Sequence, residues 1–95
     1  MYLRIWRTKV DPARVDEFYT FARERSLPMF NEQDGFIDVF FGEGPDDHVT
    51  VTLWEDEQSI EALERSASYG ATVAAINATG LLRGDQSVEV FRLRP

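Results

Sequence analysis

Strand-like and helix-like patterns follow one another along this chain in the order β-α-β-β-α-β. The strand-like stretches alternate with a period of two and are rich in β-branched and aromatic residues, whereas the helical stretches repeat apolar residues every three or four positions. The predicted strands cover residues 2–9, 34–43, 48–55 and 87–94. This order predicts an α+β fold of the ferredoxin-like split βαβ type, with a four-stranded antiparallel sheet and two helices on one face.

The first helical stretch has recognisable start and stop signals. Asp11 is placed to cap a helix, and Pro12 stands in its first turn, where a missing N–H costs nothing. Pro28 disfavours helical angles at the residue before it, so we expect a break or kink there. Ser26 is then available to cap a short second piece.

The second helical stretch begins after Trp54. The acidic residues 55–57 stand at the positive end of the expected helix dipole, so capping explains them without catalysis. Gly70 is expected to interrupt this helix, and Gly80 to end it.

Both faces of the predicted sheet carry apolar side chains, although two helices can cover only one face. On strand parity, one face of the second strand carries Phe36 and Phe40, and the other carries Ile37, Val39 and Phe41. In the last strand, Val88 and Val90 lie on one face, and Phe91 and Leu93 lie on the other. An antiparallel sheet with water on one side should show clean alternation instead. We therefore expect a homodimer that packs sheet against sheet.

The charge and composition exclude several classes of function. Ten basic residues against 17 acidic ones give a net charge of −7, which repels nucleic acid and anionic membrane surfaces. The chain has no cysteine and one histidine, so we expect no metal site and no cysteine nucleophile. There is no signal-peptide pattern and no long apolar segment, which predicts a cytoplasmic protein.

Few residues suggest chemistry by themselves. His48 follows a Gly- and Asp-rich hairpin loop, where we expect it to be solvated, and no nucleophile stands beside it. No phosphate-binding loop, dinucleotide fingerprint or zinc signature is present. Aromatic residues make up 13% of the chain, more than a small core needs, and a pocket lined by them would suit a planar apolar ligand.

The stretch VTLWEDEQSIEALERSASY follows a β-hairpin and is preceded by a helix and DGFIDVFF. With the ending TGLLRGDQSVEVFRL, it resembles the antibiotic biosynthesis monooxygenase (ABM) family of dimeric α/β-barrel proteins. The resemblance implies one ABM-like domain over residues 1–95, a sheet-to-sheet dimer, and a pocket between sheet and helices. Characterised members oxidise quinols or polyketide-type phenols with dioxygen and without a cofactor, while another branch degrades haem.

The haem branch is disfavoured, because the stretch SIEALERSASYGATVAA lacks the histidine ligand and the further tryptophan of that branch. We therefore expect no cofactor and a small aromatic ligand. The predicted catalytic residues are Trp54, Tyr69 and Arg83, with Arg83 stabilising a phenolate and Tyr69 turned inward at the Gly70 interruption. The predicted substrate-binding residues are Trp6, Phe40, Trp54, Tyr69 and Asn77.

Two questions stay open at this stage. Trp54 shares a strand face with Thr52, and it faces either the dimer partner or the pocket, depending on which side the helices cover. The function is either cofactor-independent oxygenation of a quinol or polyketide-type aromatic, or non-catalytic binding of a ligand or protein by a dimer of the same fold.

Overall fold

Four strands form one antiparallel sheet in the order β2-β3-β1-β4 in the computed structural model, which describes residues 1–95. The strands are β1 (Tyr2–Val10), β2 (Phe36–Glu43), β3 (His48–Trp54) and β4 (Leu82–Arg92). Helical connections join β1 to β2 and β3 to β4. The predicted ferredoxin-like fold is confirmed.

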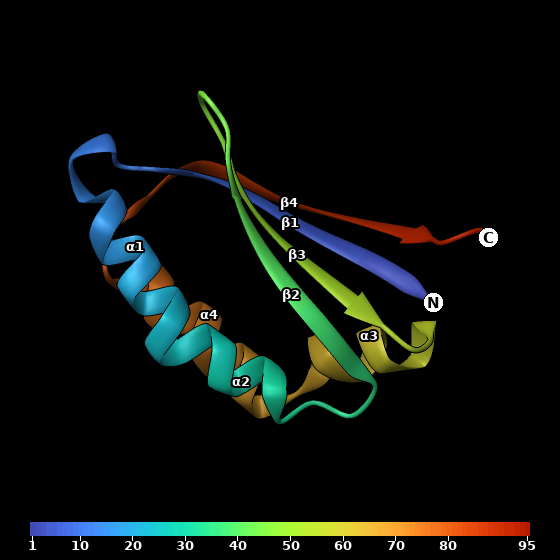
Figure 1. The fold of residues 1–95 in the computed structure, drawn as a ribbon. Helices are drawn as coiled ribbons and strands as arrows, with labels where there is room; N and C mark the ends of the chain where they lie inside the picture. Colours follow the sequence, from blue (N-terminus) through green and yellow to red (C-terminus); the bar gives the residue numbers. More distant parts are fainter.

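The helices lie along one face of this sheet (Figure 1). The first connection contains a 3₁₀ turn (Pro12–Arg14), α1 (Val15–Phe21), a π-helical segment (Ala22–Ser26) and α2 (Leu27–Asn31). The second contains α3 (Glu57–Arg65) and α4 (Ala67–Ala78). In Figure 1, α1, α2 and α4 form a layer opposite the strands, and α3 lies near the end of β3.

The first connection starts as predicted but passes Pro28 differently. The Asp11 carboxylate accepts a hydrogen bond from the Ala13 N–H at 3.0 Å. Ser26 does not cap a separate piece, because its backbone is helical and its side chain makes no capping bond. The π-helical segment leads into α2 without a gap, and the Leu27 N–H bonds to the Ala22 carbonyl. A proline ring crowds the carbonyl four residues earlier, and a widened π turn relieves such crowding.

The second connection confirms the predicted helix start and corrects the predicted interruption. The Asp56 carboxylate accepts from Ser59 N at 2.8 Å and from Ser59 Oγ at 2.7 Å, and these hydrogen bonds lower the pKa of Asp56. The interruption lies at Ser66, whose extended backbone ends α3 and whose hydroxyl caps α4 by accepting from Tyr69 N at 3.1 Å. The prediction for Gly70 is wrong, since Gly70 lies inside α4. The helix is interrupted at Ser66 because its hydroxyl can cap the start of α4, which a glycine inside the helix does not do.

The helices cover the sheet face that carries Trp54. Along β3, Thr50, Thr52 and Trp54 are buried, whereas Val51 and the other aliphatic residues of the strand keep partial exposure. The side chain of His48 is also on the covered face and only 7% exposed, so the expectation of a solvated loop histidine is wrong. The apolar face that the helices leave uncovered is called the open face below. Its apolar residues are Leu3, Ile5, Phe40, Val49, Val51, Leu53 and Phe91.

A β-bulge changes the parity of β2. The register between β2 and β3 shifts between Phe36 and Asp38, which pairs Phe36 with Trp54 and Phe40 with Val51. Phe36 therefore lies on the helix-covered face, whereas Phe40 lies on the open face. The prediction that Phe36 and Phe40 share a face is wrong. Bulges of one residue reverse the alternation in this way.

The buried apolar residues form two separate clusters under the helices. One contains Met29, Phe30, Trp54, Ile60 and Leu63, near α2 and α3. The other contains Val10, Phe18, Ile76 and Leu81, near α1 and α4. The space between the two clusters holds the cavity described next.

Candidate functional site

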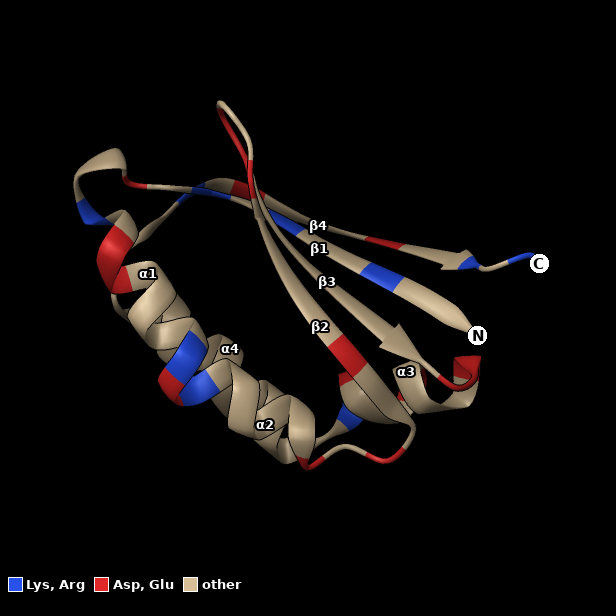
Figure 2. Ribbon diagram, in the orientation of Figure 1, with Lys and Arg blue, Asp and Glu red and all other residues tan.

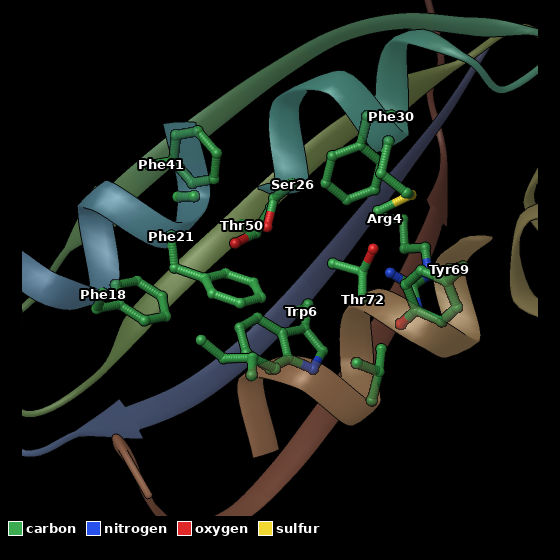
Figure 3. Close-up of a pocket in the computed structure, with 14 residues that line it drawn as sticks. Arg4, Trp6, Phe18, Phe21, Ser26, Phe30, Phe41, Thr50, Tyr69 and Thr72 are labelled. Atoms are coloured by element: carbon green, nitrogen blue, oxygen red, sulfur yellow. The ribbon is translucent and has the colours of Figure 1, made fainter. Parts of the chain in front are cut away.

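A cavity lies between the sheet and the helices, at the junction of the two core clusters (Figure 3). Fourteen residues line it, and ten of them are hydrophobic. The aromatic ones are Trp6, Phe18, Phe21, Phe30, Phe41 and Tyr69. About 50 Å³ is free for the centre of a water-sized molecule, and the empty space with its open mouth is about 490 Å³. The cavity is therefore a narrow slot with an open mouth.

Two of the polar residues in the lining have uncommitted hydroxyl groups. The four polar residues are Arg4, Ser26, Thr50 and Thr72. The Thr72 hydroxyl donates to the Ser68 carbonyl at 2.8 Å. The Ser26 and Thr50 hydroxyls make no hydrogen bond within the chain. Every fully buried polar side-chain atom has a hydrogen-bond partner, so these two hydroxyls are not fully buried. Both hydroxyls are therefore open to the cavity and can bond a ligand. They come from opposite walls, the π-helical segment and β3.

Arg4 supplies the only charge in the lining. It is 3% exposed, and its Nε donates to the Glu64 carboxylate at 3.1 Å. Its Nη2 donates to the Tyr69 hydroxyl at 2.8 Å, and its guanidinium carbon lies 5.2 Å from the centre of the Tyr69 ring. The Glu64 side chain is 42% exposed and does not line the cavity. The interior therefore presents a positive group that is oriented by a tyrosine and a surface carboxylate.

The structure brings two of the predicted site residues to this cavity, Trp6 and Tyr69. Trp6 projects from β1 and Tyr69 from the first turns of α4. Tyr69 points inward because the Ser66 cap sets the start of α4, and not because of Gly70.

The other four predicted site residues lie outside the lining. Trp54 is fully buried in the first core cluster, and its Nε1 donates to the Thr52 hydroxyl at 2.7 Å. Phe40 is on the open face and is 55% exposed. Asn77 is exposed and accepts a hydrogen bond from Gln86. The guanidinium of Arg83 pairs with Asp11 at 2.7 Å on the surface.

The polar residues of the cavity lining that were not predicted as site residues are Arg4, Ser26, Thr50 and Thr72. One signal pointed to Arg4, since it shares a strand face with Trp6. The same parity links Thr50 to Thr52 and Trp54 on β3. Ser26 had no such signal, because its direction depends on the π-helical segment.

Tyr19 and His48 form a second polar contact beside the cavity. The Tyr19 hydroxyl lies 2.9 Å from His48 Nδ1, and both rings pack on Phe18, which lines the cavity. Partial burial, followed by the negative charge of Glu43, raises the pKa of Tyr19 above its ordinary value of 10.0.

This raised pKa predicts an alkaline loss of stability. Above pH 10.0, Tyr19 ionises in the unfolded chain before it does so in the folded chain, so the free energy of unfolding falls as the pH rises. Below that pH the contribution is fully present. Urea unfolding of wild type and Tyr19→Phe between pH 8 and 11 should give a shallower decline for the variant. Parallel curves would contradict the assignment.

Two further kinds of feature are absent from the fold. No three His, Cys, Asp or Glu side chains gather closely enough to hold a metal ion. No helix combines the length and the apolar character needed to cross a membrane.

Comparison with known proteins places this chain in a family. The family model described as "Antibiotic biosynthesis monooxygenase" matches residues 1–75. The chain belongs to the ABM family. Among curated proteins, none matches it.

Solved structures share the fold of this ABM-family chain over nearly its whole length. A conserved protein from Methanosarcina mazei Go1 is 18% identical with a TM-score of 0.79, over 99% of this chain and 94% of that one. A protein of unknown function from Nitrosomonas europaea is 22% identical with a TM-score of 0.77, over 97% and 87%. SnoaB, a cofactor-independent oxygenase from Streptomyces nogalater, is 18% identical with a TM-score of 0.77, over 99% and 93%. At these identities the likeness concerns the fold alone.

Proposed function

We propose that this ABM-family protein is a cofactor-independent monooxygenase that oxidises a small electron-rich aromatic, with a quinol as the favoured substrate. The observation that carries the proposal is the aromatic-lined slot that holds one buried arginine and two uncommitted hydroxyls. Membership of the family and the oxygenase named among the similar structures support the same reaction.

The reaction is balanced without any further reductant. A hydroquinone and one dioxygen give a hydroxylated benzoquinone and one water. One oxygen atom enters the ring, the other leaves as water, and the substrate supplies the electrons. The protein therefore has to orient the ring, exclude water and favour the electron-rich phenolate.

The slot offers groups for each of these tasks. Trp6 and Phe21 supply aromatic walls for a planar ring. Ser26 and Thr50 can bond the phenolic oxygens from opposite walls. The positive charge of Arg4 favours an anionic ligand, the task that the sequence analysis gave to Arg83. A single-ring quinol suits the narrow slot better than a fused polyketide, which would need the walls to move.

Oxygen uptake by the metal-free protein with a panel of single-ring quinols tests this proposal. Thr50→Val keeps the shape of the side chain and removes one hydroxyl. It should lower kcat/KM by about threefold to tenfold, which corresponds to one lost hydrogen bond. Thr20→Val is the matched control, because Thr20 lies on α1 outside the cavity lining.

No uptake above the buffer rate across the panel would contradict the oxygenase. It would favour the second candidate, a non-catalytic dimer that binds a small aromatic ligand. One observation favours this alternative: the lining contains no carboxylate or histidine that could act as a general base. Retained quinol binding without oxygen uptake would identify that case.

The proposed functional unit is a homodimer formed through the open face. Phe40 and Phe91 on this face are 55% and 48% exposed, a large apolar exposure for a folded monomer. The charged pair Arg7 and Glu89 lies on the same face at 3.1 Å. A second copy is the occupant with matching chemistry, because a two-fold axis sets the same apolar strands against each other.

A further inference from the structure

We infer that Arg4 and Tyr69 form a carboxylate-binding end of the cavity, so that the preferred ligand is an aromatic acid. This inference rests on the proposed function in taking the same cavity as the ligand site. It adds the chemical class of the ligand and the residues that select it.

Arg4 has hydrogen-bond donors left for a ligand. Its Nε and one Nη2 hydrogen are used by Glu64 and Tyr69. Its Nη1 makes no hydrogen bond within the chain. Every fully buried side-chain nitrogen of this protein has a hydrogen-bond partner, so Nη1 is not fully buried and keeps open surface. Since Arg4 lines the cavity, a ligand inside can reach this N–H group.

Tyr69 offers a second donor at the same end. Its hydroxyl oxygen accepts from Arg4 at 2.8 Å, and its own hydrogen has no acceptor in the chain. Figure 3 shows the Arg4 guanidinium beside the Tyr69 ring, on the side of the cavity away from Phe18 and Phe21. Two neighbouring donors, one of them charged, match the two oxygens of a carboxylate.

Charge selects an acid over a phenol at this position. Arg4 is the only charged residue in the lining, and its partner Glu64 lies outside it. Acidic segments are instead spread over the outer surface, on the hairpin and at the starts of α1 and α3 (Figure 2). At pH 7 a carboxylate arrives ionised, whereas a phenol with a pKa near 10 arrives neutral. Arg4, already paired with Glu64, therefore gains a second ionic partner only from the acid.

The rest of the slot suits the ring of such an acid. In Figure 3, Ser26 and Thr50 lie between the Arg4 end and the Phe18 and Phe21 end. A carboxylate at Arg4 thus places ring hydroxyls near Ser26 and Thr50. A quinol that carries its acid group on the ring fulfils both requirements.

The test compares 2,5-dihydroxybenzoate with its neutral counterpart, 2,5-dihydroxybenzamide, by calorimetry at pH 7. Wild type should bind the acid about tenfold to hundredfold more tightly. Arg4→Met should abolish the preference, Arg4→Lys should restore part of it, and Tyr69→Phe should reduce it. Arg14→Met is the matched control, since Arg14 also pairs with a glutamate, Glu17, and lies in the helix layer outside the cavity lining. It should keep the full preference.

Several outcomes would overturn the inference. Equal affinity of wild type for acid and amide would do so even if Arg4→Met failed to fold. Binding of 4-nitrophenolate as tight as that of 4-nitrobenzoate at pH 8.5 would assign the site to phenolates instead. Oxygen uptake without an acid preference overturns this inference and leaves the oxygenase standing. An acid preference without oxygen uptake supports this inference and contradicts the oxygenase.

Discussion

Replacing Gly35 with alanine should destabilise the fold by about 2–5 kcal/mol, from backbone strain and overpacking together. Gly35 has φ +78, which side chains rarely adopt, and it joins α2 to β2. An added Cβ would lie 1.9 Å from Ser59 Oγ and 2.6 Å from Ser59 Cβ. The loop cannot simply move away, because the Gly35 carbonyl accepts from Glu55 N at 2.9 Å.

Gly70→Ala is the matched control for this substitution. Gly70 lies inside α4, and an added Cβ would meet nothing within 4 Å, so alanine should stabilise by about 0.5–1 kcal/mol. Ser59→Gly removes the atoms that collide, so the Gly35→Ala/Ser59→Gly double variant should lose less than the sum of the two single variants. Urea unfolding followed by circular dichroism measures the stability of the four variants and of wild type. A Gly35→Ala variant as stable as wild type would contradict the close packing of this turn.

Replacing Phe40 with aspartate should convert the proposed dimer into monomers or insoluble protein. Phe40 is already 55% exposed in the single chain, so the substitution does not remove a side chain from the core. In a dimer, the new carboxylate would be buried against apolar strands without a partner. Such burial costs about 3 kcal/mol or more, which raises the dimer dissociation constant by at least about a hundredfold.

Sedimentation equilibrium at micromolar concentration measures this effect. Wild type should show twice the 10.9 kDa mass of the chain, and Phe40→Asp should show the single mass. Ala71→Asp is the control, because it adds the same charge at an exposed position of α4. It should remain dimeric. A wild type that sediments as a monomer would contradict the interface.

Much of the cavity depends on features that local patterns do not encode. The bulge after Phe36 reverses the parity of β2, and the π-helical segment sets the direction of Ser26. Trp54 illustrates the limit. Its position at the end of β3 and its large ring suggested a ligand wall, but the Thr52 hydroxyl satisfies its indole N–H inside the core. Arg83 likewise lies outside the cavity lining, at the start of β4, where it pairs with Asp11 on the surface.

The sequence by itself determined the order of strands and helices, the cap at Asp11, and the acidic helix start at residues 55–57. These features depend on side chains within a few residues of one another, so they can be read along the chain. Only the tertiary structure decided which sheet face the helices cover. Both faces are apolar, so hydrophobicity cannot choose between them, and the choice follows from the path of the two helical connections across the sheet. Because the helices cover that face, Arg4 and Trp6 line the cavity, whereas Phe40 lies on the open face.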